Sequence, residues 1–583
     1  GYMKATLAYL GDLTATDPRF SNARVIPGMG NSANQVESIF GVCMAAVADA
    51  DPEFAGQLRY LHRLAKGRIV KPRKFKGKFF NTTDEPAYAA FYLPDIPEKP
   101  WPFATVFRPA YGVVFRAHAG TADETTMLFR AGMNWSHWDT DALNLILYSK
   151  GAPLSPGTGY QYYGGPAKQK NGLYHNQVKV GRRDLQEVFG RVDGAIIDYG
   201  FGKRADYAVA ERYYPPQLFK GGRGEMRWRR HVMFLKSNQP DGANYFVIRE
   251  TFPGGEARNK WWNWVNLETA DLISVDGRAF EKTALNRVVP ESQMPSKNGK
   301  TIEMNTAFGA SSWFWFDRKI NSRIRLTFDC NRQDQLGGKE TKTIIEVPAG
   351  QGQDFFYVLF PRTGNEPLPT CEKLGDGCLK IKTAESTDYV FISDNPLQFQ
   401  KDGITFSGKA GAVRVSRDDI AFFMNSGSGR IGHGHEEYIL EGHGPFEQAI
   451  PIRASIETGI HKVGGTEKKM QSVDIGKGIT VRGEGPFQAA LDHETIRIKT
   501  SGRKRVLFVT QPKFIIRPQL FIDDQEWMAS WTDYPASGWG TYKNTALIGL
   551  SVPKGEHGLV VRNLKFPDGW RRQFDPTIIG VQK

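Results

Sequence analysis

Residues 129–178 read FRAGMNWSHWDTDALNLILYSKGAPLSPGTGYQYYGGPAKQKNGLYHNQV. Two apolar segments in this stretch enclose a run of polar and proton-active side chains, and a second imidazole stands at its end. The polar residues are Asn134, Ser136, His137, Asp139, Asp141, Tyr174, His175 and Asn176. A packed core has no use for so many such groups, whereas strand ends on a rigid sheet can hold them facing a cleft. We interpret the stretch as the active-site half of an enzyme.

His137 lies between two tryptophans and close to two carboxylates. Alternate side chains of a strand share a face, so Trp135, His137 and Asp139 are expected to point together. An imidazole beside a carboxylate and an indole can act as an acid or a base near neutral pH. A structural polar cluster around a core histidine is the alternative, and we favour the functional site.

The length and charge of the chain bound its class. At roughly 150 residues per domain, 583 residues allow two to four domains. The net charge of +14 indicates an anionic partner, which can be nucleic acid, acidic lipid or acidic polysaccharide. Lys and Arg are scattered along the chain without the long basic run of a nucleic-acid tail, so we expect no nucleic acid. No apolar run approaches the ~20 residues of a membrane span.

The periodicity of the chain changes near residue 69. Residues 1–68 show apolar residues at three- and four-residue spacing, which predicts three helices that end a larger helical array. Residues 69–100 read as a basic linker. Short alternating segments then predict a large antiparallel β-sandwich over 101–424 and a smaller C-terminal β-sandwich over 425–583. The expected fold is mainly β with an N-terminal helical part.

The cysteines bear on the compartment. In TCEKLGDGC, Cys371 and Cys378 flank a short glycine-containing turn, and we expect a local disulfide between them. This favours a secreted or periplasmic protein. The sequence begins inside an apparent helix, so an N-terminal part is expected to lie outside it.

Two further clusters allow a functional and a structural interpretation. The segment RIGHGHEEYILEGHG could ligate a metal through its histidines, although a solvent-exposed hairpin is favoured. The segment KWWNWVN could stack sugar rings if exposed, or form core if buried, and the sequence does not decide between the two. The residues concerned are His433, His435, Glu436, Glu437 and His443 in the first cluster and Trp261, Trp262 and Trp264 in the second.

The 129–178 stretch resembles the heparinase II/III-like polysaccharide lyases, a group that includes alginate, heparin and heparan lyases. The resemblance rests on an Arg-Ala-Gly lead-in, a Ser-His step, an Asp before an apolar strand, Gly-x-Pro-Leu, a Pro-Gly-Thr-Gly-Tyr loop and a His-Asn-x-Val strand. In this chain these motifs occupy residues 130–132, 136–137, 141, 151–154, 156–160 and 175–178. The likeness covers roughly residues 1–300.

The resemblance implies an (α/α) toroid followed by an antiparallel β-sandwich, with β-elimination at a uronic acid of an anionic polysaccharide. His137 matches the catalytic histidine of the family, for proton abstraction or carboxylate neutralisation, and His175 is a second catalytic candidate. Substrate contacts are expected from Arg130, Asn134, Trp138 and Asn176.

The chain departs from the family pattern at the metal site and at the catalytic tyrosine. Related enzymes often hold zinc through a second histidine, a loop aspartate and the histidine of His-Asn. Asp139 replaces that second histidine, Ser155 stands near the place of the loop aspartate, and His175 remains. One divalent metal on Asp139 and His175 is expected to be calcium or manganese as readily as zinc. The toroid Tyr and Asn of the family lie upstream, so a separate or cleaved toroid segment supplies them, or Tyr160 replaces the tyrosine.

Two other functions compete with a lyase. A catalytically inactive carbohydrate-binding or scaffold protein of the same architecture would explain the altered metal ligands. A glycoside hydrolase would need paired carboxylates, for which Asp139 and Asp141 are available.

Overall fold

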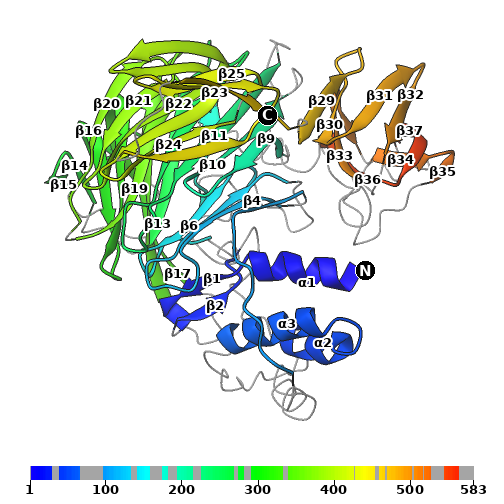
Figure 1. The fold of residues 1–583 in the computed structure, drawn as a ribbon, viewed down its shortest axis with the longest axis horizontal. Helices are drawn as coiled ribbons and strands as arrows, with labels where there is room; N and C mark the ends of the chain where they lie inside the picture. The colour runs from blue at the N-terminus through cyan, green and yellow to red at the C-terminus, as the bar shows by residue number, and fades with distance from the viewer. Residues whose placement is uncertain are drawn as a thin grey trace.

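The computed structural model describes residues 2–20, 22–28, 39–65, 96–109, 111–132, 141–157, 174–180, 194–214, 225–267, 273–280, 291–331, 339–364, 366–425, 427–452, 459–466, 469–501, 505–516, 518–526 and 544–563. Within them the chain is mainly β, with helices only near the N-terminus (Figure 1). The expected mainly-β fold with a helical N-terminal part is therefore confirmed.

The helices fall in the region that the apolar spacing predicts. They are α1 (Tyr2–Asp12), α2 (Ile39–Val47) and α3 (Pro52–Ala65). Asp51 caps α3 by accepting a hydrogen bond from the Phe54 amide at 3.1 Å. The apolar faces of the helices pack together around Trp101. None of the described helices has the length and apolar content to cross a membrane.

A short antiparallel hairpin, which the sequence pattern does not predict, joins α1 to the later helices. It consists of β1 (Ala15–Asp17) and β2 (Ala23–Val25), with the 3-10 turn η1 (Pro18–Phe20) between them. Most of the expected linker over 69–100 lies outside the described residues. Residues 96–100 run along α3, where Glu98 pairs with Arg63 at 2.9 Å and the Lys99 amide donates to Gly56 O at 3.1 Å.

A small antiparallel sheet carries the first half of the 129–178 stretch. Its strands are β3 (Val106–Arg108), β4 (Gly112–Ala117), β5 (Thr125–Arg130), β6 (Leu145–Ser149) and β7 (Ala152–Ser155). One face, with Val114, Leu128 and Ile146, packs against the N-terminal segment through Leu13 and Ile26. Tyr9 and Leu10 of α1 pack against the same core.

A large antiparallel sheet forms the centre of the molecule. Its described strands are β8 (Val178–Val180), β9 (Gly194–Phe201), β10 (Ala205–Tyr214), β11 (Met226–Leu235), β12 (Tyr245–Thr251), β13 (Lys260–Leu267), β14 (Ile273–Val275), β15 (Arg278–Ala279), β16 (Ser296–Asn305), β17 (Ala310–Asn331), β18 (Lys339–Ala349) and β19 (Phe355–Thr363). The 3-10 turn η4 (Glu291–Gln293) precedes β16.

A third sheet covers the far face of the central one. Its described strands are β20 (Thr370–Gly375), β21 (Cys378–Lys382), β22 (Ser386–Lys401), β23 (Ile404–Ser416), β24 (Asp419–Met424), β25 (Gly429–His433), β26 (Glu436–Glu441), β27 (Phe446–Pro451) and β28 (Gly459–Gly464). The pairing of β26 with β28 is parallel.

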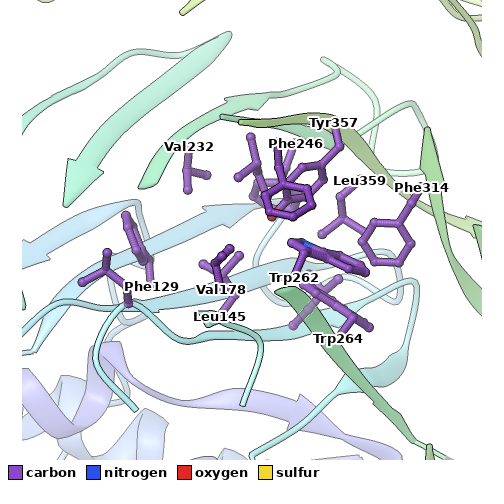
Figure 2. Close-up of a cluster of buried hydrophobic side chains, with 14 of the residues drawn as sticks. Phe129, Leu145, Val178, Val232, Phe246, Trp262, Trp264, Phe314, Tyr357 and Leu359 are labelled. Atoms are coloured by element: carbon purple, nitrogen blue, oxygen red, sulfur yellow. The ribbon is translucent and has the colours of Figure 1, made fainter. Parts of the chain in front are cut away.

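Alternation along the central strands separates two apolar cores. In β11, Val232 and Phe234 face the small sheet, whereas Met233 and Leu235 face the third sheet. Figure 2 shows the first core, where Phe129 and Leu145 of the small sheet meet side chains of the central sheet. The sandwich thus has three β layers, and the central one is buried on both faces.

A separate sandwich of two sheets follows at the C-terminal end (orange and red in Figure 1). One sheet contains β29 (Met470–Asp474), β30 (Thr480–Glu484), β33 (Arg505–Ile516) and β36 (Asn544–Val552). The other contains β31 (Phe487–Asp492), β32 (Thr495–Thr500), β34 (Pro518–Ile522), β35 (Gln525–Glu526) and β37 (Gly555–Asn563). It joins the rest through ion pairing of Arg482 with Glu211 at 2.6 Å.

The boundary that we expect at residues 424/425 falls inside the third sheet. β24 pairs with β23 on one side and with β27 on the other. Residues 370–464 therefore build one sheet across this position, because the turn after β24 returns the chain to the same layer.

The expected disulfide is wrong. Cys371 lies opposite Ile381 and Cys378 opposite Gly375, and both are free thiols. Cys371 packs against the core under the third sheet, whereas Cys378 belongs to the core on the other face of that sheet. Sulfurs on opposite faces cannot reach bonding distance.

Candidate functional site

The described parts of the 129–178 stretch converge where β5 ends and β6 begins. Of the residues expected at the site, Arg130, His175 and Asn176 are described, as is Asp141 beside them. The expected site residues that lie outside the described part of the chain are Asn134, His137, Trp138, Asp139 and Tyr160.

Arg130, the last residue of β5, forms a buried ion pair with Asp141. Its Nε lies 2.6 Å from Asp141 Oδ2, and the two side chains are 11% and 2% exposed. The backbone holds this geometry, because the Leu143 amide donates to Arg130 O at 2.8 Å and the Arg130 amide donates to Asn144 O at 3.0 Å. The turn over residues 141–144 is thus folded back onto the end of β5.

Glycine at position 112 allows β4 to approach this strand end. Gly112 has φ +133°, and a Cβ there would lie 2.0 Å from Phe129 O. Any side chain at this position would push β4 away from Arg130. The close approach also places the Tyr111 ring 5.9 Å from the Arg130 guanidinium.

His175 lies close to the same carboxylate and is buried. Burial opposes ionisation of Asp141, but the charges of Arg130 and His175 outweigh it and lower the Asp141 pKa. Asp141 therefore stays an anion between two basic side chains. The carboxylate orients Arg130 through the 2.6 Å contact, and an imidazole near such a carboxylate can transfer a proton.

Asn176 spans three strands with its side chain. Its Nδ2 donates to Leu145 O and to Ser155 Oγ, each at 2.6 Å, and its Oδ1 accepts from the Val265 amide at 2.7 Å. These bonds join β6, β7 and β13, so Asn176 positions the segment that carries His175. A substrate contact by Asn176 stays a prediction.

Two amides that the sequence pattern does not single out complete this connection. Asn144 Oδ1 accepts from the Asn176 amide at 2.8 Å, and Gln177 Nε2 donates to Ala142 O at 2.6 Å. The available signal is that an amide side chain follows each polar run within three residues, Asn144 after Asp141 and Gln177 after Asn176. Amides at such positions can satisfy backbone groups that no strand pairs.

Of the two expected metal ligands, Asp139 and His175, one is among the described residues. His175 is in place, and Asp139 lies outside the described residues. The Ser155 hydroxyl donates to Val265 O and accepts from Asn176, so it serves the backbone. No group of three His, Cys, Asp or Glu suited to a metal occurs among the described residues.

The described residues of the histidine-rich segment RIGHGHEEYILEGHG and of the tryptophan segment KWWNWVN make contacts within the fold. His433 and Glu436 face each other across the β25–β26 hairpin, and Glu436 pairs with His461 at 3.1 Å. Trp262 and Trp264 are fully buried in the core between the small and central sheets (Figure 2). The core interpretation of these two tryptophans is therefore correct.

Fold and site together define a multi-layered antiparallel β protein with a buried Arg–Asp–His cluster. No known family model matches the chain, and neither does any curated protein. Heparan sulfate lyase HepC from Pedobacter heparinus is a similar solved structure, with a TM-score of 0.41 and 12% identity over 64% of this chain and 50% of that chain. A heparinase III has a TM-score of 0.41 and 12% identity over 66% and 51% of the two chains. This chain spans about half of the length of these structures.

Proposed function

We propose that this protein is a polysaccharide lyase that cleaves an anionic, uronic-acid-containing polysaccharide by β-elimination. The observation that carries the proposal is the buried Arg130–Asp141 ion pair with His175 near its carboxylate, directly after the sequence segment that contains His137. The net charge of +14 supports a polyanionic substrate.

The reaction needs a base, an acid and neutralisation of the uronate carboxylate. The base removes the C5 proton, the electron pair forms the C4–C5 double bond, and the C4–O4 bond breaks as the acid protonates O4. We assign His137 to proton abstraction or carboxylate neutralisation, Tyr160 to protonation of O4, and His175 as the second imidazole. Arg130, Asn134, Trp138 and Asn176 are the proposed substrate contacts.

The charge state of Asp141 limits the role that this residue could take in a glycoside hydrolase. A glycoside hydrolase needs one carboxylic acid with a raised pKa to protonate the leaving oxygen. The pKa of Asp141 is instead lowered by Arg130 and His175 against the effect of burial. Asp141 therefore suits an orienting role and not that of a general acid.

The proposal includes the architecture of the helical part, the localisation of the protein and a metal ion. The described helices would form the end of an (α/α) toroid, completed by a separate or cleaved segment that supplies a Tyr and an Asn. The protein would be secreted or periplasmic. A divalent metal, if held, would lie on Asp139 and His175.

The alternative is a non-catalytic carbohydrate-binding or scaffold protein. It is favoured by Asp139, which stands where related lyases have a histidine. Such a protein would retain the charge complementarity to a polyanion without turning it over.

A substrate panel tests the proposal. The chain, together with the upstream segment proposed to supply the Tyr and the Asn, is incubated with alginate, glucuronan, heparan sulfate, chondroitin sulfate and ulvan. A lyase produces unsaturated uronates that absorb in the ultraviolet, a hydrolase produces reducing ends without this absorbance, and a binding protein retards the polysaccharide in affinity electrophoresis without either product. Reducing ends without absorbance, or retardation alone, would refute the lyase.

A further inference from the structure

Arg230 and Glu250 form a buried ion pair on the central sheet, next to the candidate site. They face each other across β11 and β12 on the side of the central sheet that covers the small sheet, and they are 1% and 0% exposed. Arg230 Nε and Nη2 both lie 2.7 Å from Glu250 Oε1. Glu250 also accepts from Trp228 Nε1 at 2.7 Å and from the Tyr357 hydroxyl at 3.1 Å. These bonds fix the plane of the guanidinium.

The remaining Arg230 nitrogen reaches both segments of the site. Nη1 donates to Asn176 O at 2.6 Å and also to Leu143 O. One of these carbonyls belongs to the segment that carries His175, and the other to the turn that carries Asp141. A single guanidinium thus connects the two segments by hydrogen bonds.

The backbone conformation at Leu143 explains why the turn needs a hydrogen bond from Arg230. Leu143 has φ +62°, a left-handed conformation that costs about 1 kcal/mol for a residue with a Cβ. It lies between the Arg130–Asp141 pair and the start of β6, where strand pairing does not fix the chain. Hydrogen bonds from the Leu143 amide to Arg130 O and from Arg230 to Leu143 O hold this conformation at both ends of the residue.

Stability alone does not account for a charged pair at this position. Well-packed apolar residues of similar volume are often as stabilising as a buried ion pair. The core around the pair is apolar and aromatic, so Met and Leu would fit chemically. What apolar residues cannot supply is a fixed donor to two carbonyls of two separate segments.

We propose that Arg230, oriented by Glu250, is a positioning residue that fixes His175 against the Arg130–Asp141 pair. The proposal rests on the lyase function for its catalytic consequence. Its structural part stands on the described contacts alone. Lysine cannot replace arginine here, because one ammonium group does not reproduce a planar fork that binds Glu250 and two backbone carbonyls at once.

The test compares R230K with the matched control R414K. Arg414 is likewise a buried arginine in a cross-strand pair, with Asp388, and it too donates to a backbone carbonyl, that of Lys236. It lies between the central and third sheets, so R414K disturbs the core without touching the site. If R230K does not fold, the double variant R230M/E250Q is used in its place, because it leaves no unpaired buried charge.

Two readouts separate positioning from general destabilisation. Hydrogen exchange is measured at the Leu143, Asn144, Asn176 and Val265 amides, which are bonded within the site. We expect faster exchange there in R230K and not in R414K. On the polysaccharide that the wild type cleaves, kcat of R230K should fall about 10- to 100-fold while KM changes less than about threefold.

The outcomes distinguish this proposal from the proposed function. Unchanged exchange at the four amides together with a kcat within about twofold of R414K would overturn the positioning role. If the wild type cleaves no polysaccharide, the lyase function fails. Exchange alone then decides whether Arg230 holds the two segments.

Discussion

Arg24 in β2 and Glu124 before β5 are joined by two hydrogen bonds of 2.7 and 2.8 Å inside the protein. Arg116 of β4 donates to the same carboxylate and also to Asp12 O and Thr14 O, each at 2.8 Å. The N-terminal segment is thus attached to the small sheet by a buried ionic cluster.

Substitution E124Q should loosen this attachment. It leaves two buried guanidinium groups without their carboxylate, so we expect a loss of about 3–5 kcal/mol in the free energy of unfolding by urea. Burial opposes ionisation of Glu124, but Arg24 and Arg116 outweigh it and lower its pKa to about 2. The contribution is therefore complete above the unfolded pKa of 4.5 and is lost as the pH falls towards 2.

The matched control is E98Q, in the exposed pair of Glu98 with Arg63. An exposed pair contributes less than about 1 kcal/mol. Equal losses in the two variants, or a loss in E124Q that persists undiminished at pH 2, would contradict the buried cluster.

Asp354, just before β19, predicts the opposite pH dependence. Burial raises its pKa to about 6, although Arg249 and Lys260 act against this shift. The folded state then binds the extra proton between pH 3.8 and 6, so this residue lowers stability as the pH rises through that window. D354N should stabilise the protein by about 1 kcal/mol at pH 8, after allowance for solvent screening, and by almost nothing at pH 4. Urea unfolding at the two pH values measures this, and an equal effect at both would contradict the raised pKa.

His137→Ala tests the proposed chemistry directly. Removal of a positioned acid or base lowers turnover about 10²- to 10⁴-fold, so the ultraviolet signal on the cleaved polysaccharide should vanish. Circular dichroism and melting should stay as in the wild type. H493A is the control, because His493 is 97% exposed in the C-terminal sandwich. Unchanged turnover in H137A would remove His137 from the mechanism.

Asn176→Asp separates a positioning role from a substrate contact. The new carboxylate would face Leu145 O and Ser155 Oγ where the amide now donates. Two lost hydrogen bonds and a buried charge should lower the free energy of unfolding by about 3 kcal/mol. N298D, at an exposed position in β16, should change it by less than about 0.5 kcal/mol. A raised KM with unchanged stability would instead favour the substrate contact.

Local patterns predict the elements of this fold well, because helix and strand periodicities are properties of a few consecutive residues. The three helices and the antiparallel strands follow from this. The pairing of β24 with β27 does not, because 21 residues separate Met424 from Phe446 and no local signal says that the chain returns to the same sheet. The expected boundary at 424/425 failed for that reason.

The prediction of a disulfide between Cys371 and Cys378 is wrong because the turn between β20 and β21 sets the register of the two strands. Asp376 and Gly377 form a two-residue turn, so Gly375 faces Cys378 and Cys371 lies further along the hairpin. An Asp-Gly pair is a strong sign of such a turn, and it could have excluded the disulfide from the sequence.

The sequence indicates the stretch of chain that carries the candidate site, but not the contacts within it. Arg130, Asp141, His175 and Asn176 lie in one stretch of the sequence, and the structure brings Arg130, Asp141 and His175 close together. Their support by Arg230 depends on the register of β11 with β12, which the sequence does not state. The remaining expected site residues lie outside the described part of the chain, so their place at the site stays a prediction.

The continuity of the third sheet past residue 424 governs how the protein can be divided. A fragment ending at 424 would strip β27 from β24 and β25 from β23, exposing backbone donors and acceptors along bare apolar strands. Such edges recruit strands from other molecules. A shortened recombinant fragment should therefore stop beyond residue 464, because earlier endpoints would leave unpaired strand edges that act as templates for aggregation.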